Sequence, residues 1–254
     1  MKKVYLCHDT ITGIYSALYD AWLKSRDAEA GIGFAGSIER QLFCEYHEVV
    51  ESEKKAAAVE RLIQNNLGYS SYWDIYHALL AEDPDKADAV FRTMQAARTL
   101  KDSRKIMEHL SNEAVVKVFE LSRKVTNEAH LFQGFVRFRE LENGVLFSEI
   151  SPKSQVLTCV ADYFSDRFPM ENWMIYDKVH RTFLVHHKQQ RWFLLHGGEV
   201  NQEALKRLSG TEDEYERLWK GFCTSISIKE RENRICQRNH LPHRFRADMT
   251  EFSG

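Results

Sequence analysis

The sequence has no long hydrophobic run, and no stretch approaches the roughly 20 apolar residues that a membrane-spanning helix requires. Its opening, MKKVYLCHDT, places the polar pair His8-Asp9 after a few apolar residues, so it does not fit a signal peptide. The five cysteines are an odd number without CxxC spacing, which argues against a disulfide framework and against a zinc ribbon. We therefore expect a cytoplasmic protein that makes no contact with a membrane.

A strong excess of one charge is also lacking. With 254 residues, a formal net charge of −2, 43% hydrophobic residues and 28% charged residues, the chain is typical of a soluble globular protein. The charge is unevenly placed, because residues 229–246 hold six Lys or Arg against two Glu, a net charge of +4. A positive segment on an acidic body favours a local anionic partner.

Residues 1–128 are predicted to form a mainly helical part. Apolar runs predict short strands at residues 4–7 and 43–50, and helical periodicity fills most of residues 12–125, with Thr12 as the first N-cap. A loop is expected at residues 26–37, where three glycines follow the order of the G-x-G-x-x-G dinucleotide motif. No strong strand precedes them and no βαβ unit surrounds them, so we interpret this match as chance.

Residues 129–254 are predicted to form a β-β-α-β-β unit with C-terminal helices, either as a second domain or continuous with the first part. Alternating side chains predict a strand at 135–141, and Asn143-Gly144 predicts a two-residue turn into a partner strand at 145–150. Ser151-Pro152 would then begin a helix, since serine is a good N-cap and proline suits the first helical position.

Three further short runs are expected to complete the sheet of this unit, at residues 173–177, 181–187 and 191–196. The predicted fold class is therefore α+β. It comprises a helical N-terminal part, a small antiparallel sheet with a β-β-α-β-β core, and a helical basic C-terminal segment.

Two groups of arginines are candidates for binding nucleic-acid phosphates. Arg137 and Arg139 share one side of a predicted strand with Phe135, and a strand surface that mixes arginine with aromatic rings suits nucleic acid. In the C-terminal segment, arginines three and four residues apart would lie along one face of a helix. The alternative for both groups is a solvated or ion-paired structural role. The candidate nucleic-acid-binding residues are Arg137, Arg139, Arg231, Asn233, Arg234 and Arg238, with Arg181 as a further phosphate contact and Phe135 or Phe138 as a base-stacking residue.

A catalytic site is the second hypothesis, because titratable residues gather around the predicted helix and the turn after residue 177. Carboxylates and imidazoles are the usual acid and base groups of enzymes. The alternative is that Asp177 and Arg181 form an ion pair that fixes a turn. The candidate catalytic residues are Asp162, Asp177, His180 and Arg181. His186, His187 and His196 have no HExxH, carboxylate or CxxC support, so neither a metal site nor a cofactor is predicted.

Several segments resemble a bacterial family of probable DNA metabolism or putative DNA repair proteins, a domain of unknown function. They are TITGIYSALYDAW, HLFQGFVRFREL with VLFSEISP, VADYFSDRFPMENWMIYDKVHR and YERLWKGFCTSISIKERENRICQRNHLPHRF. Members of that family are encoded beside a radical-SAM protein thought to repair or modify DNA, and a similar domain is fused elsewhere to a uracil-DNA glycosylase-like domain. The chain has neither the CxxxCxxC motif of the radical-SAM partner nor the local motifs of a uracil-DNA glycosylase.

The resemblance thus implies an accessory role beside a radical-SAM enzyme. We expect a DNA-binding protein that takes part in DNA repair or modification together with that partner. Two alternatives stay open: a nucleic-acid-processing enzyme with its own Asp/His/Arg site, and a pure protein-interaction partner.

Overall fold

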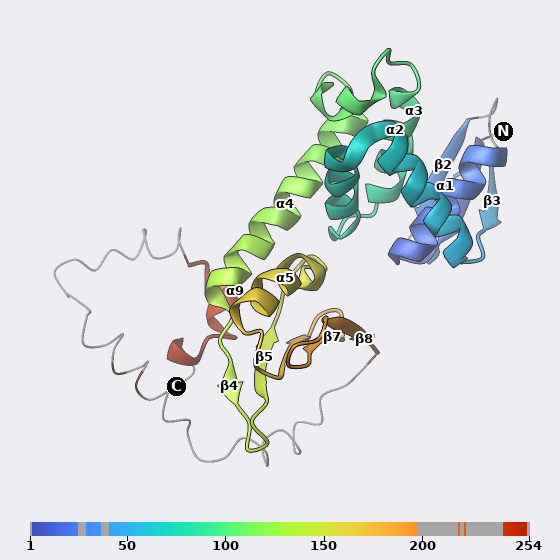
Figure 1. Cartoon of the computed structure of the whole chain (residues 1–254). Helices are drawn as coiled ribbons and strands as arrows, with labels where there is room; N and C mark the ends of the chain where they lie inside the picture. Colours follow the sequence, from blue (N-terminus) through green and yellow to red (C-terminus); the bar gives the residue numbers. More distant parts are fainter. Residues whose placement is uncertain are drawn as a thin grey trace. The chain divides into compact units, whose positions relative to one another are not determined.

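The computed structural model describes residues 2–24, 29–36, 41–197, 218, 221 and 241–252 (Figure 1). The chain forms two compact units, residues 1–126 and 127–254, and the boundary falls inside helix α4 (Glu113–Phe135). The sequence places this boundary at residue 128. The predicted α+β class is confirmed, and each unit contains its own sheet. No helix in the described part of the chain is long and apolar enough to cross a membrane.

The first unit is built on a parallel three-stranded sheet with the order β2-β1-β3. Its strands are β1 (Lys2–Cys7), β2 (Ala30–Phe34) and β3 (Cys44–Glu48), so the strands expected near residues 4–7 and 43–50 are confirmed. Strand β2, however, lies where a loop was expected. Gly31 and Gly33 conceal the strand signal in its sequence AGIGF, although all five residues are buried. A Cβ at Gly31 would lie 3.2 Å from Asp88, whose carboxylate binds the backbone N–H of Ile32 at 3.1 Å.

Helices α1 (Ile11–Lys24), α2 (Glu53–Leu79), α3 (Lys86–Ala97) and the first part of α4 complete this unit, with the 3₁₀ segment η1 (Ser103–Glu108). The N-cap of α1 is Thr10 rather than the expected Thr12, because the Thr10 hydroxyl accepts the N–H of Gly13 at 2.9 Å. Gly68, with φ of 84°, breaks α2, but the chain resumes the helix immediately afterwards.

The second unit contains a five-stranded sheet with the order β4-β5-β6-β7-β8. The strands are β4 (Arg139–Glu140), β5 (Leu146–Ile150), β6 (Trp173–Asp177), β7 (Thr182–His186) and β8 (Phe193–His196). Helix α5 (Leu157–Arg167) connects β5 to β6. The predicted β-β-α-β-β order is confirmed. The antiparallel prediction is wrong for one pair, because the α5 crossover returns the chain to the same end of the sheet and makes β6 parallel to β5.

Three local predictions in this unit are wrong. Residues 135–141 form no continuous strand, since α4 extends through Phe135 and the Val136 N–H still bonds to the Phe132 carbonyl. The hairpin loop has three residues rather than two: the Gly144 N–H bonds to the Leu141 carbonyl, and Gly144 takes a positive φ of 75°. Ser151-Pro152 does not begin α5, which starts at Leu157.

The two faces of the sheet differ in their cover. One face carries Ile150, Trp173, Ile175 and Leu184, which pack with residues of α4 and α5 into the main core of the unit. The other face holds a small separate cluster, in which the buried residues are Leu141, Phe147 and Tyr176.

Candidate nucleic-acid interface

The described end of the basic segment, residues 241–252, is fastened to the second unit, and we call it the C-terminal clasp. It contains α9 (His243–Arg246) and the 3₁₀ segment η3 (Thr250–Phe252). Phe245 is 3% exposed, and its ring centroid lies 4.9 Å from that of Phe132 and 5.1 Å from that of Phe135 on α4. Figure 1 shows α9 beside the C-terminal end of α4. The clasp is therefore part of the core, not a loose tail.

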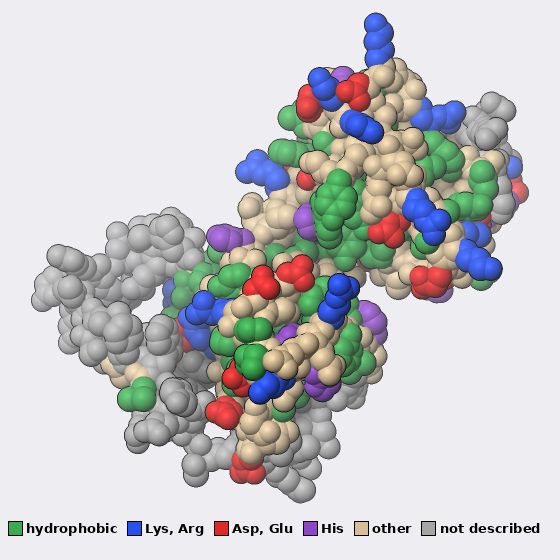
Figure 2. Space-filling view, viewed as in Figure 1, with side chains coloured by type: hydrophobic (Ala, Val, Ile, Leu, Met, Phe, Trp, Pro, Cys, Tyr) green, Lys and Arg blue, Asp and Glu red, His purple; other side chains and the backbone are tan. Residues whose placement is uncertain are grey.

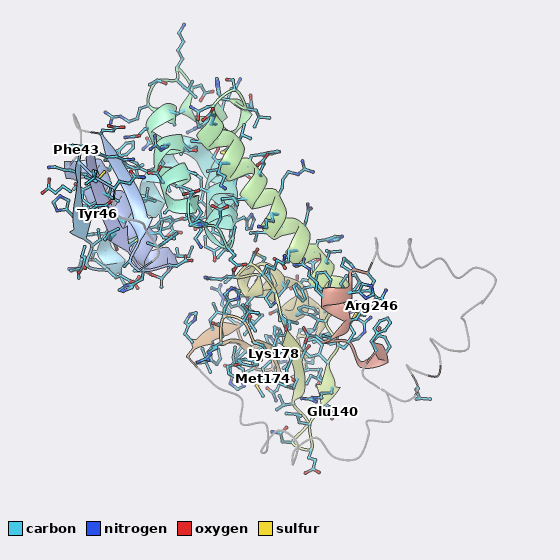
Figure 3. The ribbon with its side chains drawn as sticks, turned by 180° about the vertical axis from the view of Figure 1, so that it is seen from behind. Phe43, Tyr46, Glu140, Met174, Lys178 and Arg246 are labelled. Atoms are coloured by element: carbon cyan, nitrogen blue, oxygen red, sulfur yellow. The ribbon has the colours of Figure 1, made fainter. Side chains whose placement is uncertain are left out.

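Three ion pairs surround this apolar anchor. Arg244 Nη1 lies 2.9 Å from Glu128 Oε1, Arg137 Nη2 lies 2.8 Å from Glu251 Oε1, and Lys178 pairs with Asp248. The three carboxylate side chains are only 4%, 11% and 6% exposed, respectively. Buried carboxylates require such partners, and removing one partner of a buried pair is costly. Arg246 and Lys178, on the clasp and on the β6–β7 turn, are labelled in Figure 3.

The two predicted strand arginines have partners inside the unit. Both Arg137 Nε and Nη2 bond to the Glu251 carboxylate, and Nη1 donates to the Gly134 carbonyl at 2.8 Å. A phosphate contact through Arg137 would therefore have to displace Glu251. Arg139 lies over the Phe147 ring at 5.3 Å and 3.6 Å from the Glu149 carboxylate. The remaining candidates, Arg231, Asn233, Arg234 and Arg238, lie outside the described residues and directly precede the clasp in the chain.

Phe135 and Phe138 are partly buried, and both rings pack against other aromatic rings. Phe138 makes edge contacts with Phe164, Phe168 and Trp173, at centroid distances of 5.4, 5.5 and 6.2 Å. Phe135 packs on Phe245. Both residues are only partly buried against the core, so base stacking by one of them stays a prediction.

The turn between β6 and β7 brings together part of the predicted catalytic set. Asp177 is 1% exposed, and its Oδ1 accepts the backbone N–H groups of Val179 and His180 at 2.9 and 3.0 Å. Its other oxygen lies 2.6 Å from His180 Nδ1. Arg181 follows with φ of 51°, one of three described non-glycine residues with a positive φ. A buried carboxylate that orients an imidazole is a feature of acid–base sites and equally of rigid turns.

Asp162 does not join this group. Its carboxylate accepts the Trp192 indole N–H at 2.8 Å, and Trp192 directly precedes β8. In the sheet register, the first residue of β8 pairs with Val185, whereas Asp177 pairs with Thr182 at the opposite end of β7. The structure thus separates Asp162 from Asp177 and His180 by most of a strand.

The histidines do not converge on a metal. His186 stacks on Trp173 with centroids 4.9 Å apart, and its Nδ1 lies 3.0 Å from the Glu171 carbonyl. His196 lies at the other end of β7, where its Nδ1 is 3.2 Å from the Thr182 hydroxyl. Among the described residues, no group of three His, Cys, Asp or Glu side chains could hold a metal ion.

Described residues on both sides of the intervening stretch 198–240 contact the β6–β7 turn. At its start, the Gly197 N–H donates to the Arg181 carbonyl at 3.1 Å, one residue after β8 ends. Beyond its end, Asp248 pairs with Lys178 of the same turn. In the sequence, the basic residues 229–240 therefore lie between two described contacts with one turn of the unit.

On the face shown in Figure 2, Lys and Arg side chains alternate with Asp and Glu and do not gather into one patch. Sequence reasoning found the basic segment but missed the groups that fasten it, Glu128, Asp248 and Glu251. Phe245, an aromatic residue within a basic run, was the one signal of a buried anchor.

No curated protein matches the chain. A family profile described as "Domain of unknown function" matches residues 84–251, which include all the strands of the second unit and the clasp except Phe252, but not the parallel sheet of the first. That match covers more than half of the chain, which therefore belongs to the DUF4130 family of domains of unknown function.

Proposed function

We propose that this protein is a DNA-binding accessory protein in which the basic segment 229–246 contacts the phosphate backbone. The observation that carries the proposal is the clasp. Because Phe245 is buried and three ion pairs hold residues 241–252, the arginines just before the clasp are tethered to a folded unit. A tethered cation loses less conformational freedom on binding than one on a free tail, so each phosphate contact retains more of its free energy.

The charge distribution supports an electrostatic mode of binding. The segment carries a net charge of +4 on a chain whose total is −2. Phosphate contacts of this kind give affinity without sequence selectivity, and they weaken steeply as salt is added. From the resemblance noted above, we propose that the protein acts with a radical-SAM enzyme that repairs or modifies DNA, so that the chemistry resides in the partner.

The test is fluorescence-anisotropy binding to single- and double-stranded DNA over a salt series. The variant Arg231→Ala/Arg234→Ala/Arg238→Ala is compared with the charge-matched control Lys54→Ala/Arg61→Ala/Lys105→Ala, whose three exposed residues lie in the first unit. Each lost phosphate contact lowers the slope of log K against log salt by about 0.7–0.9, so the first variant should flatten it by about 2–3. The control should leave the slope near the wild-type value.

Two outcomes would count against the proposal. The absence of binding to any DNA form at low salt would refute it directly. An equal loss of slope in both triple variants would show a dependence on total charge alone, and the segment would then have no special role.

The Asp177–His180 contact favours a second candidate, a nucleic-acid-processing enzyme with its own site. Asp177→Asn would keep an oxygen for the turn N–H groups but remove the anionic partner of the imidazole. Loss of turnover on damaged DNA, with DNA affinity unchanged, would support this enzyme. If Asp177→Asn leaves the turnover intact, the role of Asp177 is purely structural. Co-purification with a protein partner, without any DNA affinity, would instead indicate an interaction protein.

A further inference from the structure

The ends of three helices in the first unit surround a cavity of about 310 Å³. Trp22 belongs to the last turn of α1, and Met94 belongs to the last turn of α3. Helix α2 contributes Leu62 and Leu67, of which Leu67 directly precedes the break at Gly68. Natural ligand pockets usually hold about 300–1,000 Å³. This cavity lies at the small end of that range, so it is large enough for a small molecule.

The walls of the cavity are mainly apolar. Leu67 and Met94 are buried, and the side chains of Trp22, Leu62 and Leu100 are half-buried. An apolar wall favours a ligand that removes apolar surface of its own from water. The greater part of a ligand at this site should therefore be apolar.

Two carbonyl groups at the cavity already accept hydrogen bonds. The Asn66 carbonyl accepts the Ser103 hydroxyl at 2.6 Å, and the Ala97 carbonyl accepts the N–H of Leu100 at 3.2 Å. Carbonyl groups at the C-terminal end of a helix otherwise attract a cation. Because these two are bonded within the protein, a charged side chain becomes the main polar feature of the cavity.

Arg98 is that side chain. Its guanidinium carbon lies 5.1 Å from the centre of the Trp22 ring. No described residue forms an ion pair or a hydrogen bond with this guanidinium, whereas Arg92 on the same helix pairs with Asp88 at 2.6 Å. The described residues that line the cavity include no acidic side chain. A stacked guanidinium keeps its N–H groups at its edge, where they fit the oxygens of a carboxylate or a phosphate.

The volume of the cavity limits the size of the ligand. One water molecule takes about 30 Å³ of the liquid, so the cavity corresponds to roughly ten water molecules. A methylene group takes nearly the same space, which sets the ligand at roughly ten non-hydrogen atoms. A bilayer lipid with two long chains is several times larger. A free small molecule therefore fits the cavity, and a membrane lipid does not.

We propose that this cavity binds a small amphipathic anion, which has an apolar body and one carboxylate or phosphate group. The apolar body would pack against Trp22, Leu62 and Met94, and the anionic group would bind the exposed Arg98. Asn66 is exposed at the same cavity, so its side-chain amide can donate to a second oxygen. The site lies wholly in the first unit, whereas the basic segment belongs to the second. It is therefore independent of the proposed DNA binding.

A titration of the full chain with octanoate and hexyl phosphate, two anions of about this size, tests the site. NMR follows the indole N–H signal of Trp22, which the variant Trp22→Phe identifies. At least one anion should shift this signal with a Kd of about 1 mM or tighter, and the tighter of the two identifies the anionic group. Octanol, which lacks the charge, should bind about tenfold more weakly. The proposal is overturned if neither anion shifts the Trp22 signal, or if octanol binds as tightly as both anions.

Three variants separate the role of the charge from that of the cavity. Arg98→Gln should weaken the binding of the anions about tenfold and leave that of octanol unchanged. Its matched control is Arg123→Gln on α4, an exposed arginine that lies outside the cavity and 5.7 Å from the centre of the Phe119 ring. Leu100→Trp, at a half-buried position between α3 and η1, should fill the cavity and abolish the binding of anions and octanol alike, while its thermal unfolding shows that it is folded. Equal weakening by Arg98→Gln and Arg123→Gln, or undiminished binding by folded Leu100→Trp, would overturn the proposal.

Discussion

Phe245 is predicted to control whether the C-terminal clasp stays on the second unit. Its side chain is 3% exposed between Phe132 and Phe135, while Phe252, seven residues later on the same segment, is 48% exposed. Truncating a fully buried phenylalanine to alanine costs about 3–5 kcal/mol. Because the clasp is short and is held by this one buried ring and three ion pairs, this loss should appear first as local opening and only secondarily as global unfolding.

Hydrogen exchange measures how much Phe245→Ala weakens the attachment of the clasp. Since about 1.4 kcal/mol corresponds to a factor of ten in an equilibrium constant, Phe245→Ala should raise the opening of the clasp by about two to three and a half powers of ten. The reporting amides are those of Asp248, Met249 and Phe252, which bond to carbonyls three residues earlier within the clasp. If the free energy that keeps the clasp closed is smaller than this loss, the clasp amides should exchange at the rate of an unfolded chain.

The control is Phe252→Ala, which removes the same ring from an exposed position and should change exchange less than tenfold. The amides of β5 and β6 should keep their wild-type rates in both variants. Equal effects of the two substitutions, or equally faster exchange in the core strands, would refute the reasoning that Phe245 is a local anchor.

Two further predictions concern one buried and one partly buried group. Glu128→Gln should destabilise the protein by about 3–5 kcal/mol. The Glu128 carboxylate accepts the N–H groups of Lys153 and Ser154 at 3.0 Å and pairs with Arg244, and the single oxygen of an amide cannot make all these contacts. The urea concentration at the unfolding midpoint measures the loss, and Glu142→Gln, at an exposed position, should leave that midpoint unchanged. Burial lowers the pKa of His77 below its ordinary 6.5, an effect that the nearby Asp74 only partly offsets. The unfolded chain then binds the proton more readily, so the stability that neutral His77 contributes is complete above about pH 6.5 and is lost as pH falls through the lower folded pKa. Denaturant unfolding at pH 7.5 and 5.5 should show a larger acid-induced loss in the wild type than in His77→Gln, and an equal loss would contradict this assignment.

Local sequence patterns predicted most of the elements. The strands at 173–177 and near 145–150, 181–187 and 191–196 were readable because each apolar alternation contains its own periodicity. Periodicity gave the wrong prediction where the residue types of a segment are not typical of the conformation that it adopts. Gly31 and Gly33 hid a buried strand, and the alternation after Phe135 imitated a strand at the end of a helix.

By itself the sequence determined the α+β class, the order of elements in the second unit and the position of the basic segment. Only the tertiary structure decided which charges remain available. Arg137 and Glu251 are 114 positions apart, and Glu128 binds backbone N–H groups 25 and 26 positions away. No local periodicity records such partners, because they meet only when the clasp and the β5–α5 connection pack against the C-terminal end of α4. The same fold separated Asp162 from Asp177, whose distance in space depends on strand register and not on spacing in the chain.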